Sequence, residues 1–189
     1  MTPPDAIILA GGRAQRLGGR SKPLLEVAGR TLLDRVLEAA SGIGSRTVVV
    51  VGPPELAGPG VTVVREDPPY GGPVAALAAA LPLVSAADVL LLAVDLVNGG
   101  AIAERLAVTP VSGDGVCLVD TAGRRQWLAG RYRADALRSA LAALPHVQDA
   151  ALRRALAPLD ITELAVSDEL VRDIDTPEDL EEPWRPTTS

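Results

Sequence analysis

Short, almost uninterrupted apolar runs alternate along the first half of the chain with segments whose apolar residues recur every three or four positions. The runs indicate strands buried on both faces of a parallel sheet, and the recurring spacing indicates helices with one buried face. We expect strands at residues 6–10, 47–51, 61–64 and 88–94, with helices at 31–40 and 74–81. This alternation predicts βαβ units and a mostly parallel sheet.

The second half of the chain is less regular. Its strands are expected at residues 115–120, 126–132 and 161–166, and its helices at 135–144, 150–156 and from 177. No repeat, low-complexity block or linker divides the chain, so residues 1–189 are predicted to form one domain with a frayed tail at 182–189. The predicted fold is a three-layer α/β/α sandwich, Rossmann-like, around a mostly parallel sheet.

Composition and charge narrow the classes of function. Of the 189 residues, 48% are hydrophobic and 22% are charged, which is typical of a globular protein. The net charge of −6 argues against general nucleic-acid binding, and the single cysteine, Cys117, excludes an internal disulfide and a cysteine-cluster metal site. No segment has the roughly 18 consecutive apolar residues of a membrane span, and the start of the chain lacks a secretion signal, so we expect a cytoplasmic protein.

The segment after the first apolar run carries the strongest chemical signal. Gly11 and Gly12 follow the run directly, and Arg13, Arg16 and Lys22 come soon after. Glycine lets the backbone approach a ligand closely, and backbone N–H groups with cationic side chains make an anion site. The segment lacks the Gly-x-Gly-x-x-Gly of dinucleotide-binding folds and the Gly-Lys-Ser/Thr of a Walker loop. It predicts a phosphate-handling loop, with a Gly/Arg-rich surface loop as the alternative.

A second candidate is Asp95, which follows the most apolar predicted strand, at residues 88–94. Ligands of open α/β sheets bind across the carboxyl ends of the strands, which is the edge where the glycine pair is also expected. Because Mg²⁺ prefers oxygen ligands and keeps several waters, one or two carboxylates can hold it. Asp95 is therefore our candidate Mg²⁺ ligand. The alternative is that its side chain caps the following turn.

These motifs together resemble a known family. Residues 9–25 read Leu-Ala-Gly-Gly-x-x-x-Arg-Leu-Gly-Gly-x-x-Lys-x-Leu-Leu, which resembles the signature loop of nucleotidyltransferases that activate small phosphorylated compounds. Within that superfamily the chain looks most similar to the MobA-like molybdenum cofactor guanylyltransferases. The Leu-Ala-Gly-Gly form favours guanine, because cytidylyl relatives usually carry Ala-Ala-Gly. Later stretches that resemble motifs of the same family are 66–77, 94–96, 125–133 and 173–180.

The last of these stretches has two explanations. Thr176 is a good helix N-cap and Pro177 suits the first helical position, so helix initiation accounts for half of the motif. Asp173 and Asp175 are the residues that this explanation leaves over.

The resemblance implies the nucleotide-diphospho-sugar transferase fold and transfer of GMP from GTP–Mg²⁺ to the terminal phosphate of Mo-molybdopterin, with release of pyrophosphate. It assigns catalysis to Arg16, Lys22 and Asp95. The residues implied in nucleotide binding are Leu9, Ala10, Gly11, Gly12, Arg13, Lys22, Asp67, Gly72 and Asp95, and those implied in acceptor binding are Gln126, Asp173 and Asp175. Molybdenum-insertion proteins and molybdoenzyme chaperones become candidate partners; no nucleic acid or membrane is expected as a partner.

Three residues depart from the family pattern. Ser21 stands where the family usually has Asp, Val97 where it has Pro, and Asp173 where Asn is more usual. A cytidylyltransferase, a sugar-phosphate nucleotidyltransferase and a non-catalytic nucleotide- or partner-binding protein of the same fold therefore stay open as alternatives. Turnover of GTP to pyrophosphate with an acceptor present separates the enzymes from the non-catalytic protein.

Overall fold

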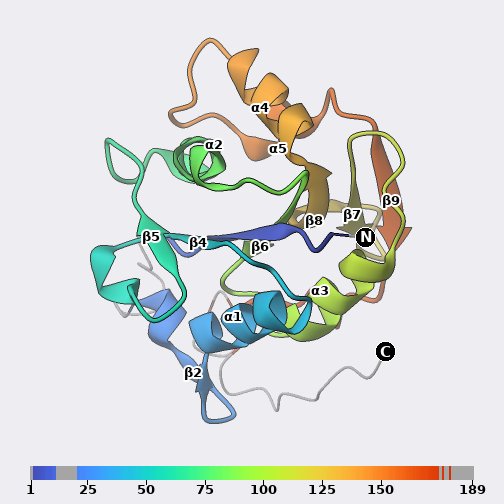
Figure 1. Cartoon of the computed structure of the whole chain (residues 1–189). Helices are drawn as coiled ribbons and strands as arrows, with labels where there is room; N and C mark the ends of the chain where they lie inside the picture. The colour runs from blue at the N-terminus through green and yellow to red at the C-terminus, as the bar shows by residue number, and fades with distance from the viewer. Residues whose placement is uncertain (1, 12–20, 175, 177–178, 180–189) are drawn as a thin grey trace.

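A computed structural model describes residues 2–11, 21–174, 176 and 179 of the chain. Its centre is a seven-stranded sheet with the order β5–β4–β1–β6–β8–β7–β9 (Figure 1). The strands are β1 (Asp5–Leu9), β4 (Val48–Val51), β5 (Thr62–Val64), β6 (Asp88–Ala93), β7 (Gly115–Val119), β8 (Arg125–Arg133) and β9 (Ile161–Ala165). Only β8 runs antiparallel to its neighbours in this sheet, so the prediction of a mostly parallel sheet is confirmed.

Helices cover both faces of the sheet, which makes the three layers that the sequence predicts (Figure 1). On one face lie α1 (Leu32–Gly42) and α3 (Gly99–Val108), and on the other α2 (Gly72–Ala80), α4 (Ala134–Ala142) and α5 (Leu152–Leu156). Successive side chains of a strand point to opposite faces, so the apolar run of β1 serves both layers. Ile8 packs in the cluster with Val36 of α1, and Ile7 in the cluster with Leu77 of α2.

The segment from residue 21 to α1 is built from short elements. It contains the 3₁₀-helix η2 (Lys22–Leu24) and an antiparallel hairpin of β2 (Glu26–Val27) and β3 (Arg30–Thr31); two further 3₁₀-helices are η3 (Pro54–Leu56) and η4 (Leu81–Leu83). The N–H of Asp34 donates to Oγ1 of Thr31 at 3.0 Å, so Thr31 is the N-cap of α1. Pro23 is buried, which holds η2 against the protein at the edge of the sheet.

Helix α3 is absent from the sequence-based expectation. Glycine weakens a helix by about 1 kcal/mol relative to alanine, so Gly99 and Gly100 in succession argue against one. A Cβ added at Gly99 would lie 3.3 Å from Cγ2 of Val36, so the missing side chain lets α3 approach α1 closely. Ile102 and Leu106 are buried on the inner face of α3. Packing of this face outweighs the low helix propensity of the glycines.

The predicted terminal helix and the tail at 182–189 lie almost entirely outside the described residues. Within the described part, the N–H of Thr176 donates to Oδ2 of Asp179 at 2.7 Å, and the N–H of Asp179 donates to Oγ1 of Thr176 at 3.3 Å. This reciprocal pair is a capping box, which supports helix initiation at Thr176.

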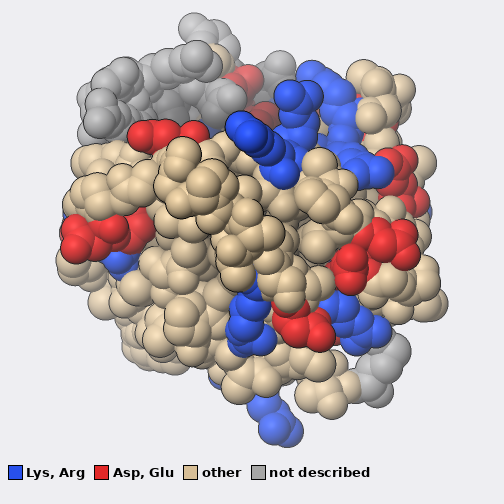
Figure 2. Space-filling model, turned by 90° about the horizontal axis from the view of Figure 1, so that it is seen from above, with Lys and Arg blue, Asp and Glu red and all other residues tan. Residues whose placement is uncertain are grey.

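Two properties of the whole molecule concern its partners. No helix in the described ranges is long and apolar enough to cross a membrane. On the face above α2, α4 and α5, small groups of basic and acidic side chains are interspersed among uncharged ones (Figure 2).

Candidate active site

The carboxyl ends of β1 and β6 lie side by side and carry the first predicted site segments. Leu9 at the end of β1 pairs with Ala93 at the end of β6, and the N–H of Ala10 donates to the carbonyl oxygen of Val51 on β4 at 2.9 Å. Leu9 and Ala10 are buried. Their backbone therefore sets the place on the edge at which Gly11 leaves the sheet.

Lys22 and Asp95 meet at this edge. Nζ of Lys22 lies 2.8 Å from Oδ2 of Asp95, with 19% and 22% of the two side chains exposed. Lys22 is the first residue of η2 and the only lysine in the chain. The structure thus brings together the two predicted groups that carry opposite charge.

The Asp95 carboxylate does not cap the turn after β6. It pairs with Lys22, and no backbone N–H of the described residues donates to it. The turn is held instead by the backbone at the start of the stretch 173–180, called here the late motif. The N–H of Ile174 donates to the Asp95 carbonyl oxygen at 3.2 Å, and Leu96 forms an antiparallel bridge with Asp173. Asp173 is exposed and pairs with the residue that follows Asp95, so the two predicted acidic positions belong to neighbouring segments of the chain.

Val97 shows why this loop departs from the family pattern. Its side chain is buried, and its N–H donates to the carbonyl oxygen of Arg172 at 3.2 Å. Proline has no N–H and could not make this bond. The valine therefore joins the turn after Asp95 to the late motif by one additional hydrogen bond.

Asp67 and Gly72 lie on the same edge but further along it. Asp67 is exposed after β5, which is two strands from β1, and makes no contact with the Lys22–Asp95 pair among the described residues. Gly72 begins α2 with φ of +87°, a conformation that favours glycine, and a Cβ there would lie 3.8 Å from Cα of Asp149. The backbone conformation at this position therefore explains why residue 72 is a glycine, without a role in nucleotide binding.

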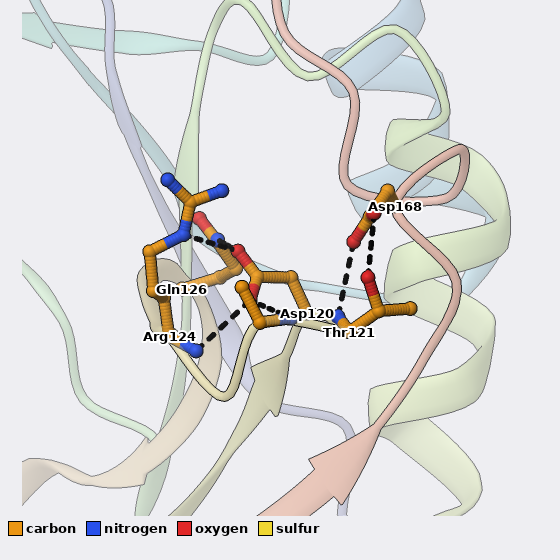
Figure 3. A network of polar contacts seen from close by, with 6 residues as sticks. Asp120, Thr121, Arg124, Gln126 and Asp168 are labelled. Carbon is orange, nitrogen blue, oxygen red and sulfur yellow. Dashed lines mark hydrogen bonds and ion pairs between the residues drawn. The ribbon is translucent and has the colours of Figure 1, made fainter.

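On the other side of β6, Gln126 belongs to a polar network that the sequence did not predict (Figure 3). At its centre is Asp120, which follows β7 and is buried. Its Oδ1 accepts the N–H groups of Ala122 at 3.0 Å and Arg124 at 2.9 Å, and its Oδ2 accepts Nε of Arg124 at 2.8 Å and Nε2 of Gln126 at 3.0 Å. The sequence contains one feature that could have identified Asp120: it is an aspartate directly after a buried strand, as Asp95 is.

The electrostatics of this network favour ionised carboxylates. The backbone N–H of Arg124, followed by its guanidinium, holds the pKa of Asp120 below its usual range. The Thr121 hydroxyl donates to Oδ2 of Asp168 at 2.6 Å and the Thr121 N–H to Oδ1 at 3.0 Å, and these bonds lower the pKa of Asp168. Next to Asp168 in the chain, the backbone carbonyl oxygen of Glu169 accepts a bond from Nδ2 of Asn98 at 2.8 Å, which connects this segment to the turn after β6.

Several predicted residues lie outside the described part of the chain: Gly12, Arg13, Arg16 and Asp175. Their roles stay predictions. Gly11 is described and exposed, and a Cβ added there would meet only the Val51 carbonyl oxygen, at 3.8 Å. The described protein therefore leaves room for a side chain at Gly11.

The donor set can be tested against a divalent ion. The described residues contain no group of three or more His, Cys, Asp or Glu side chains arranged to hold a metal. Asp95 offers a partly exposed carboxylate that now pairs with Lys22, and Asp173 bridges the residue that follows it. This arrangement fits Mg²⁺, which is commonly bound through one or two carboxylates and its own waters.

Comparisons with known proteins agree with this geometry. Residues 6–164 match the family model described as the MobA-like NTP transferase domain. Molybdenum cofactor guanylyltransferase of Rhodopseudomonas palustris is 44% identical over 85 residues, which is 43% of this chain and 40% of that protein. The chain thus matches less than half the length of this relative.

Two solved structures share the fold. Molybdopterin-guanine dinucleotide biosynthesis protein A of Archaeoglobus fulgidus is 21% identical with a TM-score of 0.68, and the match covers 94% of this chain and 95% of that one. Rv0371c of Mycobacterium tuberculosis in complex with manganese is 20% identical with a TM-score of 0.70, covering 95% and 97%. At these identities the likeness shows the nucleotidyltransferase fold.

Proposed function

Since the chain belongs to the MobA-like NTP transferase domain family, we propose that it transfers GMP from GTP to the terminal phosphate of Mo-molybdopterin and releases pyrophosphate. The family makes it a nucleotidyltransferase. The name of the relative from Rhodopseudomonas palustris and the Leu-Ala-Gly-Gly form of residues 9–12 support guanine and this acceptor.

One observation carries the proposal: the 2.8 Å contact between Lys22 and Asp95 at the carboxyl ends of β1 and β6. Nucleotidyl transfer requires a cation for the triphosphate and a carboxylate for a divalent ion at one place. Lys22 supplies the first and Asp95 the second. The exposed glycine at position 11 lets the nucleotide approach the backbone between them.

In the proposed reaction an oxygen of the acceptor phosphate attacks the α-phosphorus of GTP. The bond between the α-phosphorus and the bridging oxygen breaks, and pyrophosphate leaves with the electron pair. Lys22 binds the triphosphate and neutralises part of its charge. Asp95 would hold a divalent ion, whose chemistry would be to withdraw charge from the α-phosphate. We propose Mg²⁺ for this ion; the manganese in the Rv0371c complex supports a divalent cation on this fold.

The acceptor is proposed to lie on the β8 side of Asp95. Gln126 is near the start of β8, the strand next to β6, and its amide is held by Asp120. Asp173 bridges Leu96, the residue after Asp95. In the strand order, β8 lies on the side of β6 away from β1 and Gly11, so Gln126 supports an acceptor on that side.

The test is pyrophosphate release by the purified chain with Mg²⁺, GTP or CTP, and Mo-molybdopterin or a sugar phosphate. We expect release only with GTP and Mo-molybdopterin together, and release slowed by about a hundredfold or more in the Asp95→Asn variant. Turnover with CTP or with a sugar phosphate would replace the proposal by the corresponding alternative. GTP binding without turnover on any acceptor would identify a non-catalytic nucleotide-binding protein.

A further inference from the structure

Arg124 has an arrangement that packing does not explain. Its side chain is 77% exposed, yet its Nε is held 2.8 Å from Oδ2 of the buried Asp120. The two terminal nitrogens of the guanidinium form no hydrogen bond or ion pair with a described residue, and they point away from Asp120 (Figure 3). The result is an oriented cation with its two outer donors turned to solvent.

Stability does not account for this pair. An ion pair with so exposed a partner adds little to the stability of a fold, because water screens the attraction. The turn is already closed by backbone bonds, from the N–H of Gly123 to the Asp120 carbonyl oxygen at 2.9 Å and from the N–H of Asp120 to the Arg124 carbonyl oxygen at 3.1 Å. Since neither stability nor closure of the turn explains the contact between Arg124 and Asp120, its main effect is to orient the Arg124 guanidinium.

The position of the turn links it to the reaction. Strand β8 is antiparallel to β6, with Ala129 paired to Leu92, so its first residues lie at the edge that carries Asp95. Arg124 immediately precedes β8. The neighbouring Arg125 is engaged elsewhere, because its Nε lies 2.6 Å from Oε1 of Glu163 on β9. Arg124 is thus an oriented cation with unengaged donors on the side of the edge where the acceptor is proposed.

We propose that Arg124 binds the phosphate group of the acceptor substrate, a phosphate monoester, and that Asp120 is the positioning residue that orients Arg124 and Gln126. Guanidinium groups bind phosphate through paired N–H donors, and an oriented guanidinium loses less conformational freedom on binding. The identity of the acceptor rests on the proposed function; binding of a phosphate monoester at Arg124 does not.

The first test removes the charge at position 124. Arg124→Gln keeps an amide that can reach Asp120 but loses the outer donors, and Arg46→Gln makes the same charge change at an exposed residue before β4, at the opposite edge of the sheet. Arg124→Gln should weaken binding of phenyl phosphate and raise KM for molybdopterin by about tenfold or more, with GTP affinity unchanged. Arg46→Gln should behave as wild type.

The readouts separate the two proposals. Calorimetric titration with phenyl phosphate requires no turnover, so it tests Arg124 even if the chain transfers no GMP to molybdopterin. Wild-type binding of phenyl phosphate that Arg124→Gln leaves unchanged would overturn the assignment, and so would the absence of binding by wild type. Loss of binding in Arg124→Gln alone supports it, whatever the acceptor proves to be.

The second test concerns the positioning role of Asp120. Asn in place of Asp120 can still accept the two backbone N–H groups through its oxygen, but its NH₂ group would face the donors of Arg124 and Gln126. Asp120→Asn should weaken phenyl phosphate binding severalfold, and the double variant with Arg124→Gln should bind no more weakly than Arg124→Gln alone. Additive losses in this cycle would show that Asp120 acts independently of Arg124, against the proposal.

Discussion

Nζ of Lys22 lies 2.8 Å from Oδ2 of Asp95 although the two residues are 73 positions apart in the chain. The contact joins the loop after β1 to the end of β6. A carboxylate that binds a divalent ion gives up an ammonium partner, and an ammonium that binds phosphate gives up the carboxylate. The pair therefore predicts that binding of metal and of nucleotide at this edge are coupled, each making its group available to the other.

Asp95→Asn tests the metal role. The two side chains are nearly equal in size, and no described backbone group depends on the carboxylate, so the fold should be retained. Loss of a metal-held charge at the α-phosphate should reduce kcat by about a hundredfold or more, while GTP affinity changes little because Lys22 remains. Pyrophosphate release over a magnesium titration measures this, and normal turnover with an unaltered magnesium dependence would remove Asp95 from the site.

Lys22→Met tests the other half of the pair. The aliphatic stem is kept and the ammonium is lost, so GTP affinity measured without metal should fall by about tenfold or more. The nucleotide-free variant should bind Mn²⁺ severalfold more tightly than wild type, since Asp95 no longer has a competing cation. Calorimetry and the electron paramagnetic resonance signal of free Mn²⁺ give the two affinities. Mn²⁺ binding by the variant that equals or is weaker than that of wild type would contradict the coupling.

The single lysine offers an independent measurement of the same contact. Reductive methylation with ¹³C-formaldehyde keeps the charge and labels only Lys22 and the chain's amino terminus. We expect the Lys22 resonance to shift when GTP is added. An Asp95→Asn sample serves as the control for the free-state position, and a resonance insensitive to GTP would exclude Lys22 from the nucleotide site.

Gly11 tests close approach of the nucleotide. Because an added Cβ would lie 3.8 Å from its nearest neighbour, Gly11→Ala should leave the melting temperature nearly unchanged but weaken GTP binding. Gly115→Ala is the contrasting variant, since its Cβ would lie 2.8 Å from the Arg131 carbonyl oxygen and should destabilise the fold. Unchanged GTP affinity in Gly11→Ala would show that the nucleotide does not pass close to this backbone.

Cys117 predicts a dependence on alkaline pH. Burial, assisted by the carboxylate of Glu163 and opposed by Arg125, raises the pKa of the Cys117 thiol from 9.0 to about 11. The unfolded chain loses this proton first, so the stabilising contribution is complete below pH about 9 and is lost as the pH rises through about 11. Denaturant unfolding at pH 8 and pH 10.5 should show a larger loss in wild type than in Cys117→Ala, in which the buried Tyr132 still titrates. Equal losses would contradict the role given to Cys117.

The sequence alone was sufficient for the sheet and for the edge where the site lies. Apolar runs such as Ile7–Leu9 and Val89–Leu92 have no polar face, and only a layer of helices on each side removes both faces from water. The carboxyl ends of parallel strands lie at one edge of a sheet. The sequence alone therefore predicts that Gly11 and Asp95 lie at the same edge. Each of these patterns lies within one short segment, so it can be identified without knowledge of the rest of the fold.

Tertiary structure decided which side chains meet at that edge. The contact of Lys22 with Asp95 depends on the pairing of β1 with β6 and on the seating of η2, neither of which is encoded within a few residues. Helix α3 forms despite two glycines because its inner face packs on α1. Asp120 acquires its side-chain hydrogen-bond donors, Arg124 and Gln126, only because the chain turns back into β8, which lies between β6 and β7. Helix and strand propensity and apolar periodicity are properties of a single segment. The hydrogen-bond partners of a buried carboxylate come from several segments, and only the folded sheet determines which ones.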